Sequence, residues 1–290
     1  MLLTYALVRV EEITWDDLFL QAVVPAAAYW IYSSLFALID AKDFFPQYRI
    51  FPLNGRLNPV SESQVVRNVL KQQFCQFALS LIIAHFEHPC GTDAPQLQVQ
   101  MHSSTDKTVL FASSHIIHFA WIMTIVRLAL RILAAMIIYD TWYFWAHYLV
   151  HKNSWLYKNL HAHHHQLYRP KAYGASFNAL AETLILETAG AFIASRISGL
   201  TSRDTIFFFT FSTLKGCDDH SGYNIPWNPI SLWGRITGAD VLHHSIHHQA
   251  WGMKYNQAFF FPFWEIILQC NYTGPRNPSS NKRPYKNKYY

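Results

Sequence analysis

Long hydrophobic stretches separated by short polar segments dominate the chain. The first stretch, residues 18–39, has 22 positions without a charged side chain. A single helical crossing of a bilayer takes about 20 predominantly apolar residues. This pattern predicts a transmembrane helix over residues 18–39, and a buried helix of a water-soluble protein is the alternative.

The next two hydrophobic segments are less uniform. Residues 72–86 are uncharged but too few for a complete crossing, and residues 108–138 are strongly apolar but contain Arg127 and Arg131. We assign both segments to an N-terminal membrane region that covers residues 1–130.

A further apolar segment, residues 177–194, contains Glu182 and Glu187. Carboxylates are costly in lipid, so we expect both glutamates to face the protein interior or to mark function. The sequence from Thr201 to Asp204 resembles a capping box, which begins a new helix. The pattern therefore predicts a helical hairpin over residues 176–214 that enters the bilayer and returns.

Composition supports an all-α integral membrane protein. Of the 290 residues, 51% are hydrophobic and 14% are charged, whereas soluble domains carry roughly 25% charged residues. Such a chain is too hydrophobic to be disordered. The net charge of +5 is too dispersed for a nucleic-acid surface. The four cysteines form no C-x-x-C pair, so a disulfide scaffold is excluded.

Charge asymmetry predicts the orientation in the membrane. Residues 152–171 and the tail after residue 270 contain basic side chains and no acidic ones, and short basic loops face the cytosol. We expect the tail to be cytosolic, its terminal Lys286 and Lys288 resembling a dilysine retrieval signal. The glycosylation sequence at Asn271 should then stay unmodified.

Histidine is the unusual residue type. The chain has 16 histidines, 11 of them between residues 147 and 248. Nine of these 11 form an H-x-x-x-H pair, two H-x-x-H-H groups and a single histidine in an aspartate-flanked motif. In order, these are His147 and His151; His161, His164 and His165; His244, His247 and His248; and His220.

These spacings indicate metal binding, because several imidazoles share one helical face. A structural zinc site would include cysteine, and the H-E-x-x-H sequence of zinc proteases is absent. Eight spaced histidines fit two metal ions held close together. Nitrogen ligands in apolar surroundings at a membrane favour iron and the activation of dioxygen.

Around these histidines the chain resembles the fatty acid hydroxylase superfamily of membrane di-iron oxygenases, and within it the sphinganine C4-hydroxylases. The resemblance spans roughly residues 45–268 and is strongest from residue 140 onward. Four segments carry it: Asp140-Thr-Trp-Tyr-Phe-Trp-Ala-His147, Phe209-Thr-Phe-Ser-Thr-Leu-Lys215, Asp218-Asp-His-Ser-Gly-Tyr-Asn-Ile-Pro-Trp227 and His247-His-Gln-Ala-Trp-Gly252.

The resemblance implies hydroxylation at carbon 4 of a sphingoid base or its ceramide. It also implies a multi-pass endoplasmic reticulum protein with two iron ions on its cytosolic side, supplied with electrons from NAD(P)H through cytochrome b5 and its reductase. The hydroxylase domain would cover residues 131–270, followed by a basic cytosolic tail, residues 271–290. The implied metal ligands are His147, His151, His161, His164, His165, His244, His247 and His248, with His220 as a ninth.

Other site residues follow from the same resemblance. Asp140 is expected to orient a ligand imidazole. The alternative is that Asp140 is a carboxylate near the N-terminal end of a helix and does not contact a ligand. Asn224 is expected either to reach a metal through water or to be an ordinary loop residue. His163 and His243 are extra to the pattern and are expected to lie behind the ligands or at the surface.

The chain also departs from the family pattern at three places. Ala179 to Glu182 replaces a His-Pro pair before a glutamate, Ser245 replaces an aspartate, and Glu265 begins a segment that is usually Asp-Arg-Leu. Alternatives are therefore a sister lipid oxidase such as a sterol methyl oxidase or desaturase, an inactive relative, or a histidine-rich membrane metal carrier. The chain has neither a haem motif of cytochrome b5 nor G-x-G-x-x-G, so an oxygenase needs a separate reductant.

Overall fold

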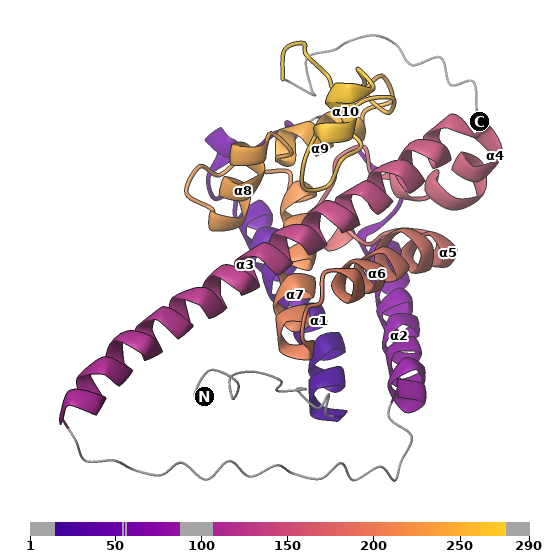
Figure 1. Ribbon diagram of the computed structural model, residues 1–290. Helices are drawn as coiled ribbons and strands as arrows, with labels where there is room; N and C mark the ends of the chain where they lie inside the picture. The colour runs from indigo at the N-terminus through magenta and orange to yellow at the C-terminus, as the bar shows by residue number, and fades with distance from the viewer. Residues whose placement is uncertain (1–14, 54, 56, 88–106, 277–290) are drawn as a thin grey trace.

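The computed structural model describes residues 15–53, 55, 57–87 and 107–276. Within these residues the chain is helical without a β-strand, apart from an isolated antiparallel bridge between Arg49 and Tyr223. The terminal Lys286 and Lys288 lie outside the described residues. The α-helices (Figure 1) are α1 Trp15–Ala41, α2 Glu62–Glu87, α3 Lys107–Lys152, α4 Ser154–Leu156, α5 Leu180–Glu182, α6 Gly190–Ile197, α7 Ser202–Asp219, α8 Pro229–Thr237, α9 Val241–His247 and α10 Phe263–Ile267.

Helix α1 contains the predicted crossing at residues 18–39. The span from residue 17 to residue 41 is long and apolar enough to cross a membrane. One side of the helix buries Tyr29, Ser33 and Phe36, while Ile31 and Leu35 are exposed. An apolar outer face of this kind is what a lipid-facing helix requires.

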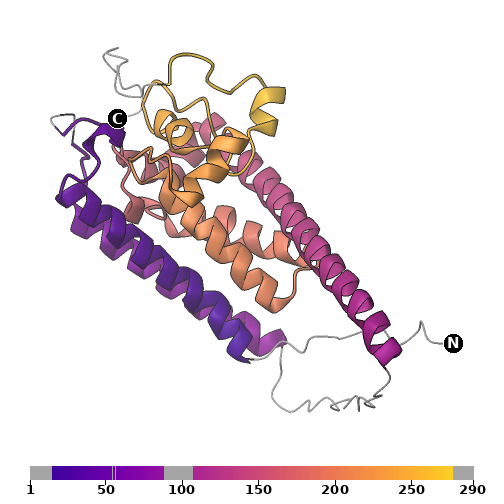
Figure 2. The ribbon, with the colours of Figure 1, turned by 90° about the vertical axis from the view of Figure 1, so that its left-hand side faces the viewer.

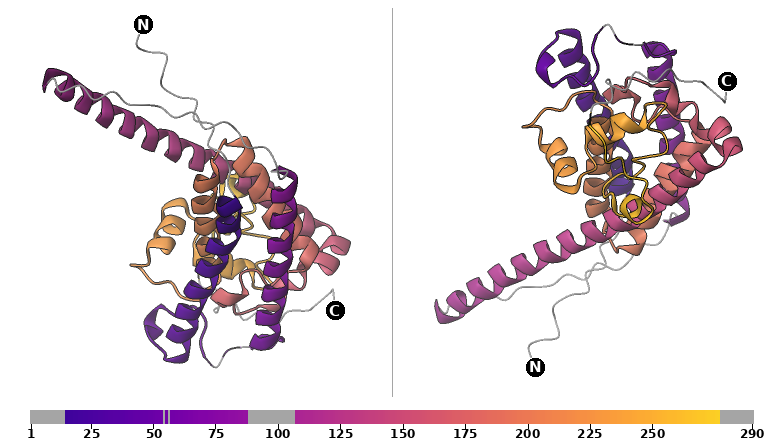
Figure 3. Two further views of the ribbon diagram at one scale, coloured as in Figure 1. Left: turned by 90° about the horizontal axis from the view of Figure 1, so that it is seen from below. Right: turned by 90° about the horizontal axis from the view of Figure 1, so that it is seen from above.

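Helix α3 is longer than the sequence pattern predicted. The apolar segment from residue 108 and the His147/His151 pair form one continuous helix of 46 residues. The beginning of this helix projects away from the other helices in both views of Figure 3. Arg127 and Arg131, near the middle of this helix, are exposed. The span 118–152 is the second one able to cross a membrane.

The predicted hairpin is present as two antiparallel helical segments. Its first arm runs through α5, a π-helical stretch at Thr183–Ala189 and α6, and its second arm is α7. Gly199 turns the chain with a φ of 68°. Thr201 and Asp204 form the expected capping box. Glu182 is buried, and Glu187 lines an internal cavity, so the expectation that both glutamates face the interior is confirmed.

The helices end in a polar cap at one end of the bundle. Helices α1 and α2 lie side by side, α7 packs on α1, and α8, α9 and α10 cover the end at which α1, α3 and α7 terminate (Figure 2). Asp40 of α1 joins the cap by accepting from Tyr223 Oη at 3.0 Å and Lys171 Nζ at 2.5 Å. All segments that carry the clustered histidines meet in this layer.

Candidate metal centre

Nine buried or half-buried histidines converge in the cap in two groups. Within each group the ligand nitrogens all lie within 4.8 Å of one another. The groups adjoin, because the rings of His165 and His248 have centroids 5.1 Å apart. The first group, which we call group A, is His147, His151, His161, His165 and His247, and the second, group B, is His164, His220, His244 and His248.

Local structure explains why each side chain points inward. His147 and His151 are one turn apart at the end of α3. A π-helical turn at Tyr157–His161 and a 3-10 turn at His164–Gln166 direct His161 and His165 into group A and His164 into group B. Helix α9 starts at Asp240, whose side chain accepts from the His243 backbone N–H at 2.9 Å.

The aspartates beside His220 fasten the end of α7. Asp218 accepts from Ser231 Oγ at 2.8 Å and from Asn228 Nδ2 at 2.7 Å, which joins α7 to α8. Asp219 forms a buried ion pair with Lys215, with Nζ–Oδ distances of 2.5 and 2.6 Å. His220 is therefore held at a helix end that is fixed from two sides.

The imidazole nitrogens of each group are arranged for a cation. In group A, His147 Nε2 lies 2.8 Å from His161 Nε2 and 3.1 Å from His151 Nε2. In group B, His220 Nε2 lies 3.1 Å from His244 Nε2 and 3.2 Å from His248 Nε2. A neutral imidazole has one N–H, so nitrogens that face several others cannot all be paired by hydrogen bonds. A metal ion at the centre accepts all their lone pairs, and the residues present fit such an ion.

The outward-facing nitrogens hold the rings in the required tautomer. The Nδ1–H groups of His247 and His220 donate to the carbonyl oxygens of Tyr255 and Gly216, each at 2.8 Å. His161 Nδ1 donates to the Glu182 carboxylate. When Nδ1 carries the proton, Nε2 keeps its lone pair for a metal, and such outer partners fix ligand orientation in metal sites.

Burial keeps these imidazoles neutral. It lowers the pKa of His220 to about 4, partly opposed by the bond to the Gly216 carbonyl. Burial together with the neighbouring histidines lowers the pKa values of His161, His165 and His248 well below their usual range. Metal ligands must be deprotonated, so the site is prepared for a cation at neutral pH.

The two other expected site residues, Asp140 and Asn224, form hydrogen bonds with groups that are not imidazoles. Asp140 Oδ1 accepts from the backbone N–H groups of residues 259–261, at 2.6 Å for Phe260. Its carboxylate thus anchors the chain that follows α9, and the expectation that Asp140 orients an imidazole stays a prediction. Asn224 Oδ1 accepts from Arg235 Nη2 at 2.7 Å, so the structure supports the ordinary loop role for Asn224.

The extra histidines lie behind the ligand groups. His163 stacks on Phe177, with ring centroids 4.1 Å apart. His243 Nε2 bonds Glu265 Oε2 at 2.9 Å. Glu265 therefore contacts a histidine of α9 that is not among the nine clustered ones. Ser245 is fully buried. The sequence carries no signal for the backbone carbonyl groups that His147 and His247 contact, those of Gln257 and Tyr255. It also did not predict that Glu182 would be the partner of His161.

A large cavity leads to group B. Its volume is about 560 Å³, and it lies between α1, α2, α3 and the hairpin, with His220 and His244 in its wall. Most of its lining is apolar, including Ala22, Phe77 and Phe192. This volume falls in the range of small-molecule sites, and the apolar walls suit a hydrocarbon chain.

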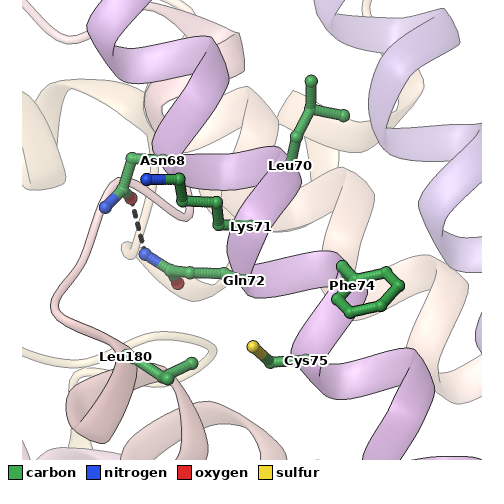
Figure 4. A pocket seen from close by; sticks show the side chains of 7 residues that line it. All are labelled: Asn68, Leu70, Lys71, Gln72, Phe74, Cys75 and Leu180. Atoms are coloured by element: carbon green, nitrogen blue, oxygen red, sulfur yellow. Dashed lines mark hydrogen bonds between the residues drawn. The ribbon is translucent and has the colours of Figure 1, made fainter.

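A second hollow, of about 530 Å³, lies on the outer side of α2 against Leu180 (Figure 4). In it, Gln72 Nε2 donates to Asn68 Oδ1 at 2.6 Å and to the Asn178 carbonyl oxygen. No histidine lines it. The cavity beside group B is therefore the one associated with the metal centre.

Comparison with known proteins identifies the family. The fatty acid hydroxylase family model matches residues 132–270. The sphingolipid C4-hydroxylase of Saccharomyces cerevisiae is 36% identical over 263 residues, which cover 89% of this chain and 73% of that protein. Sphinganine C4-monooxygenase 2 of Arabidopsis thaliana is 35% identical over 256 residues, 87% of each chain. The chain belongs to the fatty acid hydroxylase family.

More distant relatives match a shorter part. Methylsterol monooxygenase 1 of Rattus norvegicus is 36% identical over 140 residues, 48% of this chain and 45% of that protein. No solved structure matches the chain. The two relatives above that are named for C4 hydroxylation match 87% or more of this chain.

Proposed function

We propose that the protein is a membrane di-iron monooxygenase that hydroxylates carbon 4 of a sphingoid base or its ceramide. The observation that carries this proposal is the position of group B in the wall of a hydrocarbon-sized cavity. The names of the relatives supply the class of substrate. Two iron ions, when bound, supply the oxidising chemistry that inserts one oxygen atom of dioxygen into a C–H bond.

The residues of the chain have three tasks in this reaction. Group A and group B would each hold one ion through neutral imidazoles. Glu182 and the backbone carbonyls behind the rings would fix the ligand orientation. The apolar cavity walls would align the alkyl chain and exclude water from the reacting carbon.

Electron supply and location follow from the same assignment. The chain would receive electrons from NAD(P)H through cytochrome b5 and its reductase. The cap would lie on the cytosolic side of the endoplasmic reticulum membrane, and the hairpin would enter the membrane from that side. An unglycosylated Asn271 is the corresponding prediction, and sugar on this residue would overturn the orientation.

Expression in cells that lack their own sphinganine 4-hydroxylase tests the reaction. Mass spectrometry should detect a trihydroxy long-chain base that contains one atom from labelled dioxygen. Unchanged sphinganine, despite normal expression and a full metal complement, would favour an inactive relative. A different oxidised lipid would favour a sister oxidase of the family.

Metal analysis tests the centre separately. The purified protein should contain two metal ions per chain, and His164→Ala should lower the metal content much more than the matched variant His163→Ala. Equal losses would mean that the cluster is wrongly assigned. Reversible zinc binding without oxygen consumption would favour the metal carrier. Zinc in a purified sample would not identify the native metal, because zinc binds imidazoles more tightly than ferrous iron.

A further inference from the structure

Glu187 is an acidic residue of the hairpin that the metal centre does not use. It lies in the π-helical stretch Thr183–Ala189 and lines the cavity beside group B. Ionisable residues within membrane segments are costly and mark functional sites. Glu187 therefore needs a role of its own.

Two other carboxylates near the cavity and the metal centre have cationic or imidazole partners, whereas Asp218 is held by neutral donors. Asp219, which also lines the cavity, is paired with Lys215. Glu182 accepts from His161. Among the described residues, the ion pairs do not include Glu187, and its described hydrogen bond is from Asn178 Nδ2 at 2.6 Å. An amide donor does not neutralise a carboxylate, and a cationic ligand would form a direct ion pair with it. Arg196 also lines the cavity, with its guanidinium over the Phe192 ring.

The cavity places this carboxylate on the approach to the metal centre. Glu187 lines the same cavity as His220 and His244, two proposed ligands of group B. Asn178, whose Nδ2 donates to Glu187, is itself buried.

The cavity surroundings suit an amine with a long alkyl chain. Near the centre, Tyr143 lines the cavity and lies against His147 with ring centroids 5.3 Å apart. Farther along, α1 and α2 contribute apolar side chains such as Leu18, Phe77 and Ile83. A cation could be held at Glu187 while its hydrocarbon tail lies between these helices.

We propose that Glu187 binds the ammonium group of a long-chain amine and so positions the carbon to be hydroxylated. This inference rests on the proposed function and deepens it. In a sphingoid base the amine is on carbon 2, two carbons from carbon 4, so an anchored amine holds carbon 4 near the metals. A free base carries the positive charge, whereas the amide of a ceramide does not. The cavity therefore selects the free base over its N-acylated form.

Binding of simple lipids tests the anchor without turnover. We would measure the thermal stabilisation of the purified, metal-loaded protein by octadecylamine and by octadecanol, which have the same chain. A charge-assisted hydrogen bond is worth about 1.5–3 kcal/mol, so the amine should bind roughly tenfold to a hundredfold more tightly. Glu187→Gln should remove this difference and keep the response to octadecanol. The neighbouring cavity variant Thr188→Ala should retain the preference for the amine.

Several results would overturn the proposal. An equal response of the wild-type protein to the two lipids would do so without any variant. A Glu187→Gln protein that still prefers the amine would also do so. If Glu187→Gln fails to fold, Glu187→Asp takes its place, and it should keep the amine preference because it keeps the charge.

Turnover gives a second readout. With free sphinganine, Glu187→Gln should raise KM about tenfold or more with a smaller change in kcat, because it removes an anchoring contact. Wild-type protein that prefers dihydroceramide would contradict the selection argued here. Hydroxylation at carbon 4 with no amine preference would overturn the anchor alone, whereas amine binding without hydroxylation would overturn the proposed function alone.

Discussion

Replacing Glu182 with glutamine removes the negative charge that faces His161 Nδ1 and keeps the shape of the side chain. Glu182 is 3% exposed and His161 is 1% exposed, so water cannot replace the lost acceptor. The carboxylate fixes the proton on Nδ1 and raises the basicity of Nε2, which faces the centre of group A. An amide can present its NH2 group instead, and this would favour the wrong tautomer.

The size of the effect follows from that bond. A buried hydrogen bond to a charged group contributes about 1.5–3 kcal/mol, and each 1.4 kcal/mol is a factor of ten. We expect Glu182→Gln to weaken metal retention roughly tenfold to a hundredfold, which matches the usual cost of removing such a partner. Metal content measured after titration with a chelator would report the change.

The matched control is Glu187→Gln, the same substitution in the same arm of the hairpin. Glu187 bonds Asn178 rather than an imidazole, so this variant should keep its metal and lose only the preference for amines. Wild-type metal retention in Glu182→Gln would refute the reasoning. An equal loss in both variants would mean that any change in the hairpin disturbs the centre.

Three further outcomes are expected. Because burial lowers the pKa of His220 to about 4, metal content should persist as the pH falls from 7 to about 5 and drop towards pH 4; complete loss at pH 6 would contradict this. Lys215→Met should lower the melting temperature in detergent by leaving the Asp219 charge buried, a cost of about 3–5 kcal/mol, and adding Asp219→Asn should restore most of it. Gly252→Ala should abolish metal binding, because a Cβ would lie 1.9 Å from the Ile246 carbonyl oxygen; a normal metal content would show that this turn can move.

The sequence determined the helical membrane architecture and the residues that converge. An uncharged stretch at residues 18–39 has few alternatives to a helix when backbone groups must be paired within lipid, and α1 spans it. The capping box at Thr201 was predictable because its bonds are local. The nine histidines that the family pattern singled out are those that the structure brings together; their metals remain a prediction.

Only the tertiary structure divided the histidines between two groups. His164 and His165 are adjacent in sequence but belong to different groups, and His247 and His248 separate in the same way. Successive residues of a helical turn point about 100° apart, so neighbours can face different centres, but which centre each faces depends on how four segments pack. Asp140 shows the same limit, since its partners are backbone groups 119 or more positions away. Periodicity and motifs record local geometry, whereas contacts between distant segments exist only once the helices have packed.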